Sequence, residues 1–426
     1  MLVPSAFFAI AAATLVVGRP MHAGINYTRY LKEIDTTQAE LDEWRSKFGD
    51  VAQTNGWMPV SEARSTVDQE EDFRQRLFMT KQSIASIQAE NPDANFSIMS
   101  PFSLLTDEEF QNFVLNAYVR GNFTEQKSRQ LRSSTSPDTK IHGIFDSTSL
   151  ISTAESLINS VISFVQPTSD GATAYLLKGT SESSKSFKFS DFWKWVPQTP
   201  TRIDAQAPII TEDEDVIDRS ESLDWTESKC VAPIQAQGSC GSCWSFATVS
   251  VIESAQCIAN GGQSLTKYSE QQLVNCDKQN RGCNGGSPNY AFDYVQKNGL
   301  CMQHSYPYTG YVDSCRICEA ENTGLKGFSV VSGQNGLLDA LTEHPVIVAV
   351  ASGNNVWKQY TGGIVSSCGT TRPDHAVVAV GFDSSSIKVR NSWGTLWGEG
   401  GYIRLARSSS TQGTCGMLVD MTTPQM

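Results

Sequence analysis

The first 229 residues of this 426-residue chain contain no cysteine, so all 11 cysteines lie in the second half. An odd number of cysteines in an oxidising compartment leaves one thiol over, which fits five disulfides and one reactive cysteine. Two C-x-x-C pairs, at 240–243 and 315–318, would also fit a zinc site. More than 70 residues separate these pairs, far beyond the spacing of common zinc modules. We therefore expect disulfides, no metal ligands and no cofactor.

Long hydrophobic runs and basic stripes are also missing. The apolar run over residues 5–17 is too short to span a membrane, and no later run is longer. Small residues follow this run, so residues 1–23 are predicted to be a secretory signal peptide. The formal net charge is −12, and residues 1–218 hold 19 Lys+Arg against 29 Asp+Glu. This acidity disfavours binding to nucleic acids and to anionic membranes.

Three N-x-[ST] sequons begin at Asn26, Asn95 and Asn122. Sequons are glycosylated in secreted proteins, so we expect carbohydrate on the N-terminal half.

A Gly/Ser-rich loop leads directly into an apolar periodic segment after Cys243. Apolar residues then recur at three- and four-residue intervals until Asn260, which predicts a helix of about four turns that begins at Cys243. Free N–H groups and the helix dipole favour a thiolate at a helix start. The segment thus predicts a nucleophilic cysteine.

Residues 240–244 read Cys-Gly-Ser-Cys-Trp, and the C-G-[SA]-C-[WY] signature has its His and Asn roughly 130–150 residues downstream. Here His375 follows Cys243 by 132 residues and Asn391 follows it by 148. The last 200 or so residues therefore resemble a papain-like cysteine protease. The resemblance implies a two-lobed α+β fold, with a helical first lobe, a β-barrel-like second lobe and a cleft between them.

Local patterns agree with this division. Ser269–Gln272 forms a capping box, and Ser287-Pro288 opens a helix that Gly299 closes. Short Val/Ile-rich runs then predict strands at 345–351, 375–382, 386–391 and 402–406.

The resemblance assigns chemical roles to four residues. Cys243 would attack the peptide carbonyl, and His375 would hold the thiolate and protonate the leaving amine. The Asn391 oxygen would orient His375, and Gln237 would stabilise the oxyanion together with the Cys243 backbone N–H.

The same resemblance implies a substrate-binding surface. Asp420 would line the floor of the second substrate pocket, where an acid admits Arg or Lys, and Trp393 would shield the His375–Asn391 hydrogen bond. The other expected substrate-binding residues are Gly285, Gly286, Ser287, Pro288, Ala349 and Ala376.

The family pattern implies three disulfides, Cys240–Cys283, Cys276–Cys315 and Cys368–Cys415. Four cysteines remain and allow three pairings. We favour Cys230–Cys257 and Cys301–Cys318, because partners near in sequence tend to be near in space.

The chain upstream of the protease-like part has a helical pattern over residues 38–90. Glu70, Arg74 and Phe78 fall at four-residue steps and resemble the start of the helix motif in papain-family prosegments. Lys81 and its successors depart from that motif, so a plain amphipathic helix pair is the alternative. We expect an inhibitory prodomain over 24–115, a propeptide extension with an acidic linker over 116–220, and a catalytic domain over 221–426.

The resulting hypothesis is a cysteine endopeptidase made as a secreted or lysosomal/vacuolar zymogen. Three alternatives stay open: a same-fold exopeptidase with residues 116–220 as an exclusion domain, a silent binding homologue, and an acyl transferase. We expect a monomer whose partners are protein or peptide substrates, its own propeptide and cystatin-like inhibitors.

Overall fold

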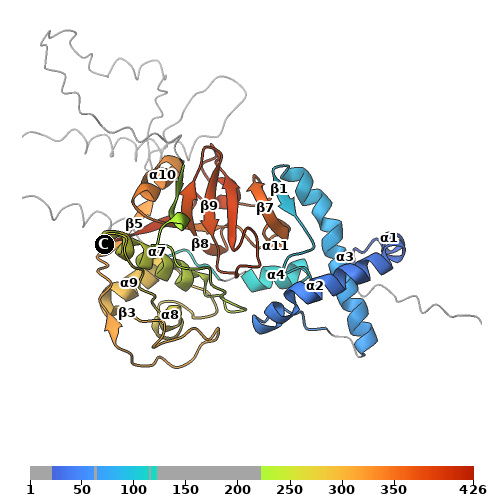
Figure 1. Cartoon of the computed structure of the whole chain (residues 1–426), viewed down its shortest axis with the longest axis horizontal. Coiled ribbons are helices and arrows are strands. Elements are labelled where there is room, and N and C mark those ends of the chain that lie inside the picture. Colours follow the sequence, from blue (N-terminus) through green and yellow to red (C-terminus); the bar gives the residue numbers. More distant parts are fainter. Residues whose placement is uncertain (1–21, 62–64, 115–116, 122–221) are drawn as a thin grey trace, which may run out of the picture. The chain divides into compact units, whose positions relative to one another are not determined.

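The computed structural model describes residues 22–61, 65–114, 117–121 and 222–426 (Figure 1). Nearly all of the predicted signal peptide, the Asn122 sequon and nearly all of 116–220 lie outside these residues. No helix in the described part is long and apolar enough to cross a membrane. The same residues contain no cluster of three or more His, Cys, Asp or Glu side chains that could hold a metal ion.

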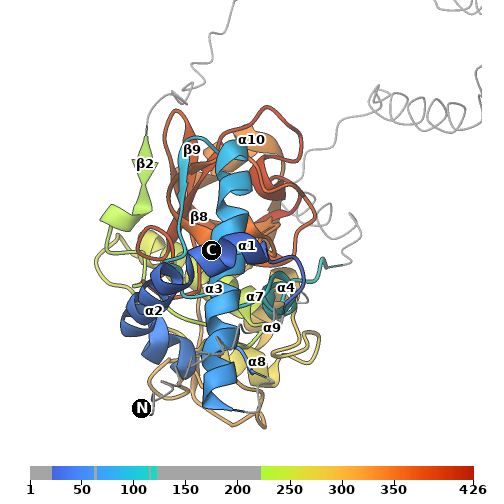
Figure 2. The same cartoon turned by 90° about the vertical axis from the view of Figure 1, so that its right-hand side faces the viewer.

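The N-terminal part is helical, as its periodicity predicts. Its helices are α1 (Tyr27–Lys32), α2 (Ile34–Thr54), α3 (Thr66–Glu90) and α4 (Asp107–Val114). Helix α3 starts where the Ser65 hydroxyl accepts the Asp68 N–H. Trp44 and Leu77 are fully buried between α2 and α3, and Figure 2 shows α1 and α2 beside α3.

The residues that resemble the prosegment motif hold these helices together. Glu70 accepts from the Arg45 guanidinium at 2.6 Å, which joins α3 to α2. Arg74 donates to the Tyr30 hydroxyl at 3.0 Å, and the Phe78 ring lies 5.2 Å from the Tyr30 ring. These contacts join α3 to α1.

The second part begins with helices. They are α7 (Cys243–Ala259), α8 (Glu270–Cys276), α9 (Pro288–Asn298), α10 (Gly333–Glu343) and α11 (Asn355–Gln359), with 3-10 turns η2 (Trp225–Glu227) and η3 (Thr414–Gly416). The three predicted helix starts are confirmed: α7 begins at Cys243, the Ser269 hydroxyl caps α8, and α9 begins at Pro288. Gly299 ends α9 with a φ of 67°, a conformation that favours glycine.

The described residues also form strands, which lie in both parts of the chain. They are β1 (Ala94–Phe96), β2 (Leu223–Asp224), β3 (Leu300–Cys301), β4 (Ala320–Glu321), β5 (Gly327–Val331), β6 (Val346–Val350), β7 (Tyr360–Val365), β8 (His375–Phe382), β9 (Ser386–Arg390), β10 (Tyr402–Ala406) and β11 (Met421–Gln425). The four predicted strand regions contain β6, β8, β9 and β10, so the α+β expectation is confirmed.

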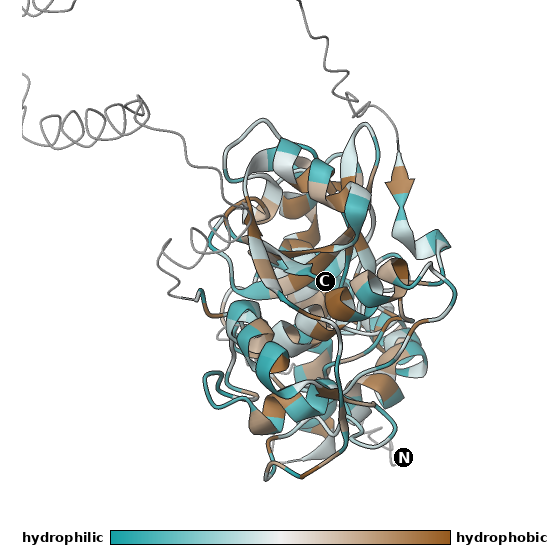
Figure 3. Cartoon of the chain, turned by 90° about the vertical axis from the view of Figure 1, so that its left-hand side faces the viewer, coloured by the Kyte–Doolittle hydropathy of each residue, from teal (hydrophilic) through white to brown (hydrophobic). Residues whose placement is uncertain are grey.

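The main sheet has the order β1-β7-β10-β9-β8-β6-β11-β5, with β2 paired to β8. Its end strands β1 and β5 each pair with one neighbour, so the described strands form an open sheet instead of a closed barrel. Every residue of β8 is buried. Figure 3 shows apolar stretches on the strands and alternating polarity along the helices.

The edge strand β1 belongs to the N-terminal part of the chain and pairs antiparallel with β7. Asn91, just before β1, accepts the N–H groups of Ser366 and Ser367 at 2.9 and 2.8 Å. A Cβ on Gly363 would meet the Asp93 carbonyl at 2.2 Å, so only glycine permits this close pairing. The N-terminal part thus extends the sheet of the second part.

Two hydrophobic cores result. One lies around α7, α8 and α9 and includes residues of β8. The other contains the interior of the sheet together with the buried side chains of α2, α3 and α4. The N-terminal helices and the sheet therefore share one continuous apolar core.

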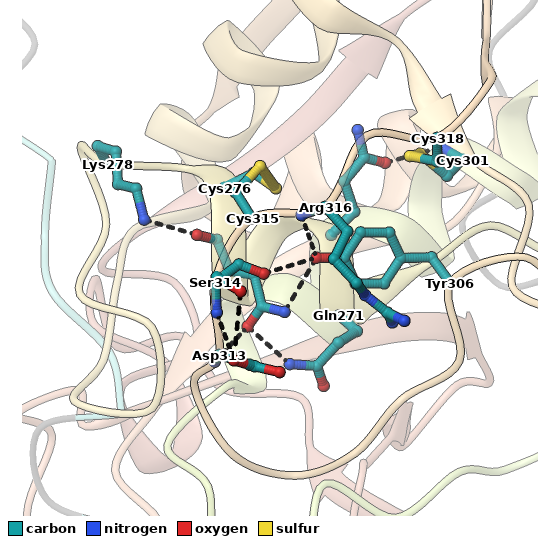
Figure 4. Close-up of a disulfide and its surroundings, with 12 residues drawn as sticks. Gln271, Cys276, Lys278, Cys301, Tyr306, Asp313, Ser314, Cys315, Arg316 and Cys318 are labelled. Atoms are coloured by element: carbon teal, nitrogen blue, oxygen red, sulfur yellow. Dashed lines mark hydrogen bonds between the residues drawn. A yellow bond between two sulfur atoms is a disulfide. The ribbon is translucent and has the colours of Figure 1, made fainter.

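Five disulfides brace the second part. The pairs are Cys230–Cys257, Cys240–Cys283, Cys276–Cys315, Cys301–Cys318 and Cys368–Cys415, the same five that the sequence analysis gives. Figure 4 shows two of them beside the loop that carries Tyr306 and Arg316. All 11 cysteines fall within the described residues, and Cys243 is the one left as a free thiol.

Two of the three sequons lie in the described part. The side chains of Asn26 and Asn95 are exposed. Asn26 also caps α1, because its side-chain oxygen accepts the Arg29 N–H at 3.1 Å.

Candidate active site

The free thiol lies where the first residues of α7 and β8 meet. Cys243 is the first residue of α7, and His375 is the first residue of β8. The Cys243 Sγ accepts the N–H of Ala376, the residue after His375, at 3.4 Å. Both Cys243 and His375 are 0% exposed. The fold thus brings together two residues that are 132 positions apart in the sequence.

The imidazole of His375 is held by Asn391, which directly follows β9. His375 Nε2 lies 2.8 Å from the Asn391 side-chain oxygen. Because an amide oxygen can only accept, Nε2 carries the proton and Nδ1 holds the lone pair of the neutral ring. Nδ1 has no hydrogen-bond partner among the described residues. This tautomer leaves Nδ1 available to exchange a proton with a thiol.

Trp393 covers the histidine. Its ring stacks on His375 with centroids 4.9 Å apart and planes inclined by 20°. The Asn391 side-chain oxygen also accepts the Ser392 N–H at 2.8 Å, and Asn391 is 2% exposed. The histidine hydrogen bond is therefore shielded from water, which strengthens it.

Gln237 is fixed by hydrogen bonds at both ends of its side chain. Its Nε2 donates to the Cys240 carbonyl at 2.9 Å, and its Oε1 accepts from the Ser392 hydroxyl at 2.6 Å. Its backbone N–H donates to the Ser392 carbonyl at 2.8 Å. An amide NH₂ has two protons, so the bond to the Cys240 carbonyl uses only one N–H of Gln237.

Residues 117–121, here called the covering segment, cross the thiol. The Ala117 carbonyl accepts from the Cys243 thiol at 3.2 Å and from the Gly286 N–H at 3.3 Å. The Val119 N–H donates to the Gly286 carbonyl at 2.8 Å, so the covering segment pairs in parallel with Gly286. Gly286 is the expected substrate-pairing edge, and here a segment of the same chain occupies it.

Burial changes the protonation of the pair. It raises the pKa of the Cys243 thiol to about 12, although the N–H groups of Ala376 and Trp244 oppose the shift. Burial likewise lowers the pKa of His375 to about 4, against the Asn391 hydrogen bond. The acidic thiol expected at a helix start is thus absent from this form. Loss of water outweighs the helix N-terminus, so both groups are neutral.

Asp420 contacts the covering segment through its side chain. Its carboxylate accepts from the Tyr118 hydroxyl and lies 3.5 Å from Arg120 Nε. The side chain of Asp420 is 12% exposed, and its backbone carbonyl accepts the Ala349 N–H at 2.9 Å. Ala349 pairs with Ala376, next to the histidine. Asp420 is therefore close to the site and already binds a hydroxyl and a guanidinium.

The remaining expected pocket residues are buried near Gly286. Ser287 and Pro288 form the start of α9 and are both buried. The Ser287 hydroxyl has no hydrogen-bond partner in the described part of the chain. A Cβ on Gly286 would meet the Trp244 ring at 2.7 Å, so glycine is required beside this helix.

Comparison with known proteins identifies the second part of the chain. The model of the papain family cysteine protease matches residues 219–425. This part of the chain belongs to the papain family.

Two curated relatives of this papain-family part come from plants. Papaya proteinase 4 from Carica papaya is 42% identical over 214 residues, which are 48% of this chain and 61% of that protein. Germination-specific cysteine protease 1 from Arabidopsis thaliana is 42% identical over 223 residues, 48% of this chain and 57% of that protein. The chain thus spans less than two thirds of each of these relatives.

Solved structures extend the likeness upstream of the papain-family part. The proform of the ragweed pollen allergen Amb a 11, a cysteine protease, is 25% identical with a TM-score of 0.60. The match covers 93% of this chain and 88% of that one. Procathepsin L 3 of Tenebrio molitor, at 21% identity and a TM-score of 0.57, shares the fold. Both solved chains include the segment that precedes a mature protease.

Sequence reasoning missed two sets of contacts. Ala117 and Tyr118 touch the site, yet they fall in the region 116–220, where we expected only a propeptide extension or an exclusion domain. Tyr308 binds Gln237 without belonging to a motif that we recognised, and Ser392, which lies between Asn391 and Trp393, had no role assigned to it. Only their position in space reveals them, because Ala-Tyr in a Ser/Thr-rich region carries no pattern.

Proposed function

We propose that this chain is the precursor of a papain-like cysteine endopeptidase. The observation that carries the proposal is a single free thiol at the start of α7, next to a histidine whose tautomer is fixed by Asn391. The membership of residues 219–425 in the papain family supports the same reaction class.

In the proposed mechanism, the Cys243 thiolate attacks the carbonyl carbon of a peptide bond. His375, as the imidazolium, then gives its proton to the leaving amine, and a thioester with Cys243 remains. His375 next removes a proton from water, which attacks the thioester and releases the acid. Gln237 Nε2 and the Cys243 N–H stabilise the oxyanion in both steps, and loss of one such donor costs about 2.7–4 kcal/mol.

The precursor is latent in this proposal because the covering segment desolvates the pair. A neutral thiol with a pKa of about 12 is a poor nucleophile. Removal of Ala117 and Tyr118 would admit water, so the ion pair could form and substrate could pair with Gly286. Residues 24–115 would serve as the inhibitory prodomain that holds the covering segment in place.

We further propose that Asp420 selects substrates. It binds the Tyr118 hydroxyl and approaches Arg120, so a substrate residue with a cationic side chain would find the same carboxylate. Ser287, Pro288, Ala349 and Ala376 would form the rest of this pocket.

Five disulfides favour synthesis in the secretory pathway and delivery to an extracellular, lysosomal or vacuolar site. The proposed partners are peptide or protein substrates, the chain's own propeptide and cystatin-like inhibitors.

One experiment tests both the reaction and the latency. Purified precursor is incubated from pH 4 to 7, its products are identified by mass spectrometry, and Cys243 is followed with a thiol-reactive active-site probe. We expect cleavage between residues 209 and 223, together with labelling of Cys243 and cleavage inside peptide substrates. Removal of dipeptides from one end would favour the exopeptidase, transfer to an added amine would favour acyl transfer, and no turnover after processing would favour a silent homologue.

A further inference from the structure

The loop after β3 places a tyrosine hydroxyl between the two sides of the proposed oxyanion site. Tyr308 donates its O–H to the Gln237 carbonyl at 2.7 Å. Its oxygen also lies 2.7 Å from the Ser242 hydroxyl. Gln237 and Ser242 lie five residues apart in the loop that leads into α7, and Ser242 immediately precedes the helix. The hydroxyl therefore joins the Gln237 loop to the start of the Cys243 helix.

The proton positions in this contact follow from the chemistry of the groups. A carbonyl can only accept, so Tyr308 must give its single proton to Gln237. The Tyr308 oxygen then accepts the proton of Ser242, whose other neighbour, the Cys240 carbonyl, is farther away at 3.4 Å. The result is one chain of hydrogen bonds from Ser242 through Tyr308 to Gln237.

The tyrosine itself is held firmly. Its ring meets the Phe246 ring edge to face, with centroids 4.8 Å apart, and Phe246 lies on the first turn of α7. The next residue, Thr309, donates its N–H to the Gln271 side chain of α8 at 2.9 Å. Burial raises the pKa of Tyr308, so the hydroxyl keeps its proton at neutral and acidic pH.

Gln237 is otherwise fixed only from the side of Ser392 and Cys240 among the contacts described above. The Cys240 carbonyl also accepts the Ser242 N–H at 2.8 Å, so it links the Gln237 side chain to the residue before α7. Tyr308 adds a second link, because it binds the Gln237 backbone carbonyl and the Ser242 side chain. Small errors in such distances are costly in catalysis, since a misplacement of about 1 Å can reduce a rate about 10²-fold.

We propose that Tyr308 is a positioning residue of the oxyanion site, which sets the spacing between the Gln237 side chain and the Cys243 N–H. The inference rests on the proposed peptidase function. Tyr308 does not touch the substrate, so its effect acts on the oxyanion and leaves the reactivity of the thiol unchanged.

The test compares Tyr308→Phe with the unmodified enzyme, both processed from the full precursor. Three quantities are measured: kcat and KM for a peptide amide, the affinity of a peptide aldehyde, and the rate of alkylation by iodoacetamide. The aldehyde forms a tetrahedral adduct whose oxygen needs the oxyanion site, whereas alkylation generates no oxyanion. We expect kcat and aldehyde affinity to fall together by about tenfold, part of the roughly 10²–10³-fold loss for a whole donor, while KM and alkylation stay unchanged.

Tyr306→Phe is the matched control, because Tyr306 lies in the same loop but binds elsewhere. Its hydroxyl accepts from Asn275 at 3.0 Å and from the Arg316 N–H at 3.1 Å (Figure 4). Tyr306→Phe should change thermal stability without changing the ratio of turnover to alkylation. An equal loss of kcat in both variants would overturn the inference, as would a parallel loss of turnover and alkylation in Tyr308→Phe.

Ser242→Ala provides a second variant in case Tyr308→Phe fails to fold. The Ser242 side chain makes no capping hydrogen bond to α7, so its removal spares the helix. It should reduce kcat and aldehyde affinity by a smaller factor, and unchanged values would contradict the inference. An unmodified processed enzyme that is alkylated but cleaves no peptide would overturn the proposed function as well. If the unmodified enzyme cleaves peptides and Tyr308→Phe has the same kcat and aldehyde affinity, the positioning role alone is overturned.

Discussion

The sulfur of Cys243 should be required for peptidase activity and not for folding. Cys243→Ala is expected to abolish peptidase activity while the precursor still folds, because the thiol lies outside all five disulfides. His375→Ala should lose activity to a similar extent. Asn391→Ala should lose less, because the amide orients the imidazole and exchanges no proton. Steady-state kinetics on processed enzyme, with thermal unfolding of each variant, provide the measurement, and turnover by the alanine variant of Cys243 would refute the mechanism.

Asp420 gives a prediction about specificity. Asp420→Ala should slow cleavage of Arg-Arg peptide amides by roughly 10- to 100-fold relative to Phe-Arg or Leu-Arg amides, since a hydrogen bond to a charged group contributes about 1.5–3 kcal/mol. Asp420→Asn keeps the size of the side chain and removes its charge, so it should show most of the same loss. The ratio of kcat/KM for the two substrate types is measured on processed enzyme. An unchanged ratio would show that Asp420 does not face the substrate.

At the level of single residues, the sequence predicted some properties of the site and not others. Cys243, His375, Asn391 and Gln237 were found through a signature and its spacing, and the fold brings the first three together. The charge state of the pair was not predictable from a helix start. It depends on burial, and one residue that contacts the thiol, Ala117, lies 126 residues earlier in the chain and carries no recognisable motif.

Among the elements, those set by local signals were predicted well. Helices α7, α8 and α9 start at a loop boundary, a capping serine and a proline, all of which are visible in the sequence. Strand β1 was not predicted, since three residues with no strong alternation become a strand only by pairing with β7. This strand forms one end of the open sheet, and it comes from the N-terminal part.

Helix α4 contributes an ion pair that makes docking of the prodomain sensitive to acid. Asp107 of α4 pairs with Lys358 of α11 at 2.9 Å, and Lys358 is 2% exposed. Burial would raise the pKa of Asp107, but the Lys358 ammonium outweighs it and holds the pKa below its usual value. Glu109 also has a lowered pKa, because its hydrogen bonds to Arg76 and Thr106 outweigh burial. The other polar groups that face this pair are Arg76, Glu109 and Asn355.

The sign of the pH effect follows from these lowered pKa values. A carboxyl group whose pKa is lower in the docked state stabilises docking above its free pKa, about 4, and loses this contribution as pH falls below it. Docking should therefore be stable at neutral pH and weaken below about pH 4. Asp107 is 62% exposed, so solvent screens its own share, and the larger effect is the burial of Lys358 without a partner.

Asp107→Asn tests this reading in a precursor that also carries Cys243→Ala, which prevents cleavage. The variant should undock at a higher pH, because buried Lys358 has lost its carboxylate. Tryptophan fluorescence and limited proteolysis from pH 7 to 3 would give the midpoint. Glu108→Gln, which changes an exposed neighbouring carboxylate on α4, is the control and should leave the midpoint in place. Equal midpoints for all three proteins would exclude a role for the Asp107–Lys358 pair.

Aromatic packing, in addition to ion pairs, joins the prodomain to the protease part. Phe102 and Phe110 lie 5.2 and 5.8 Å from the Trp393 ring, which itself stacks on His375. All three aromatic residues are at most 1% exposed and belong to the core that continues into the sheet. The tryptophan that shields the histidine thus also anchors the prodomain, so docking and the environment of the active site are coupled.

Phe110→Ala should break this coupling and open the precursor at neutral pH. Truncation of a buried phenylalanine costs about 3–5 kcal/mol, so the population with an uncovered thiol should rise by roughly two orders of magnitude or more. The measurement is the initial rate at which an active-site thiol probe labels Cys243 at pH 7.5, with mass spectrometry to verify that the precursor is intact. Phe110→Leu retains much of the volume and should give an intermediate rate, whereas Val67→Ala alters a side chain that is 76% exposed and should change nothing. If Phe110→Ala labelled as slowly as the unmodified precursor, the shared core around Trp393 would not be what keeps the covering segment on the thiol.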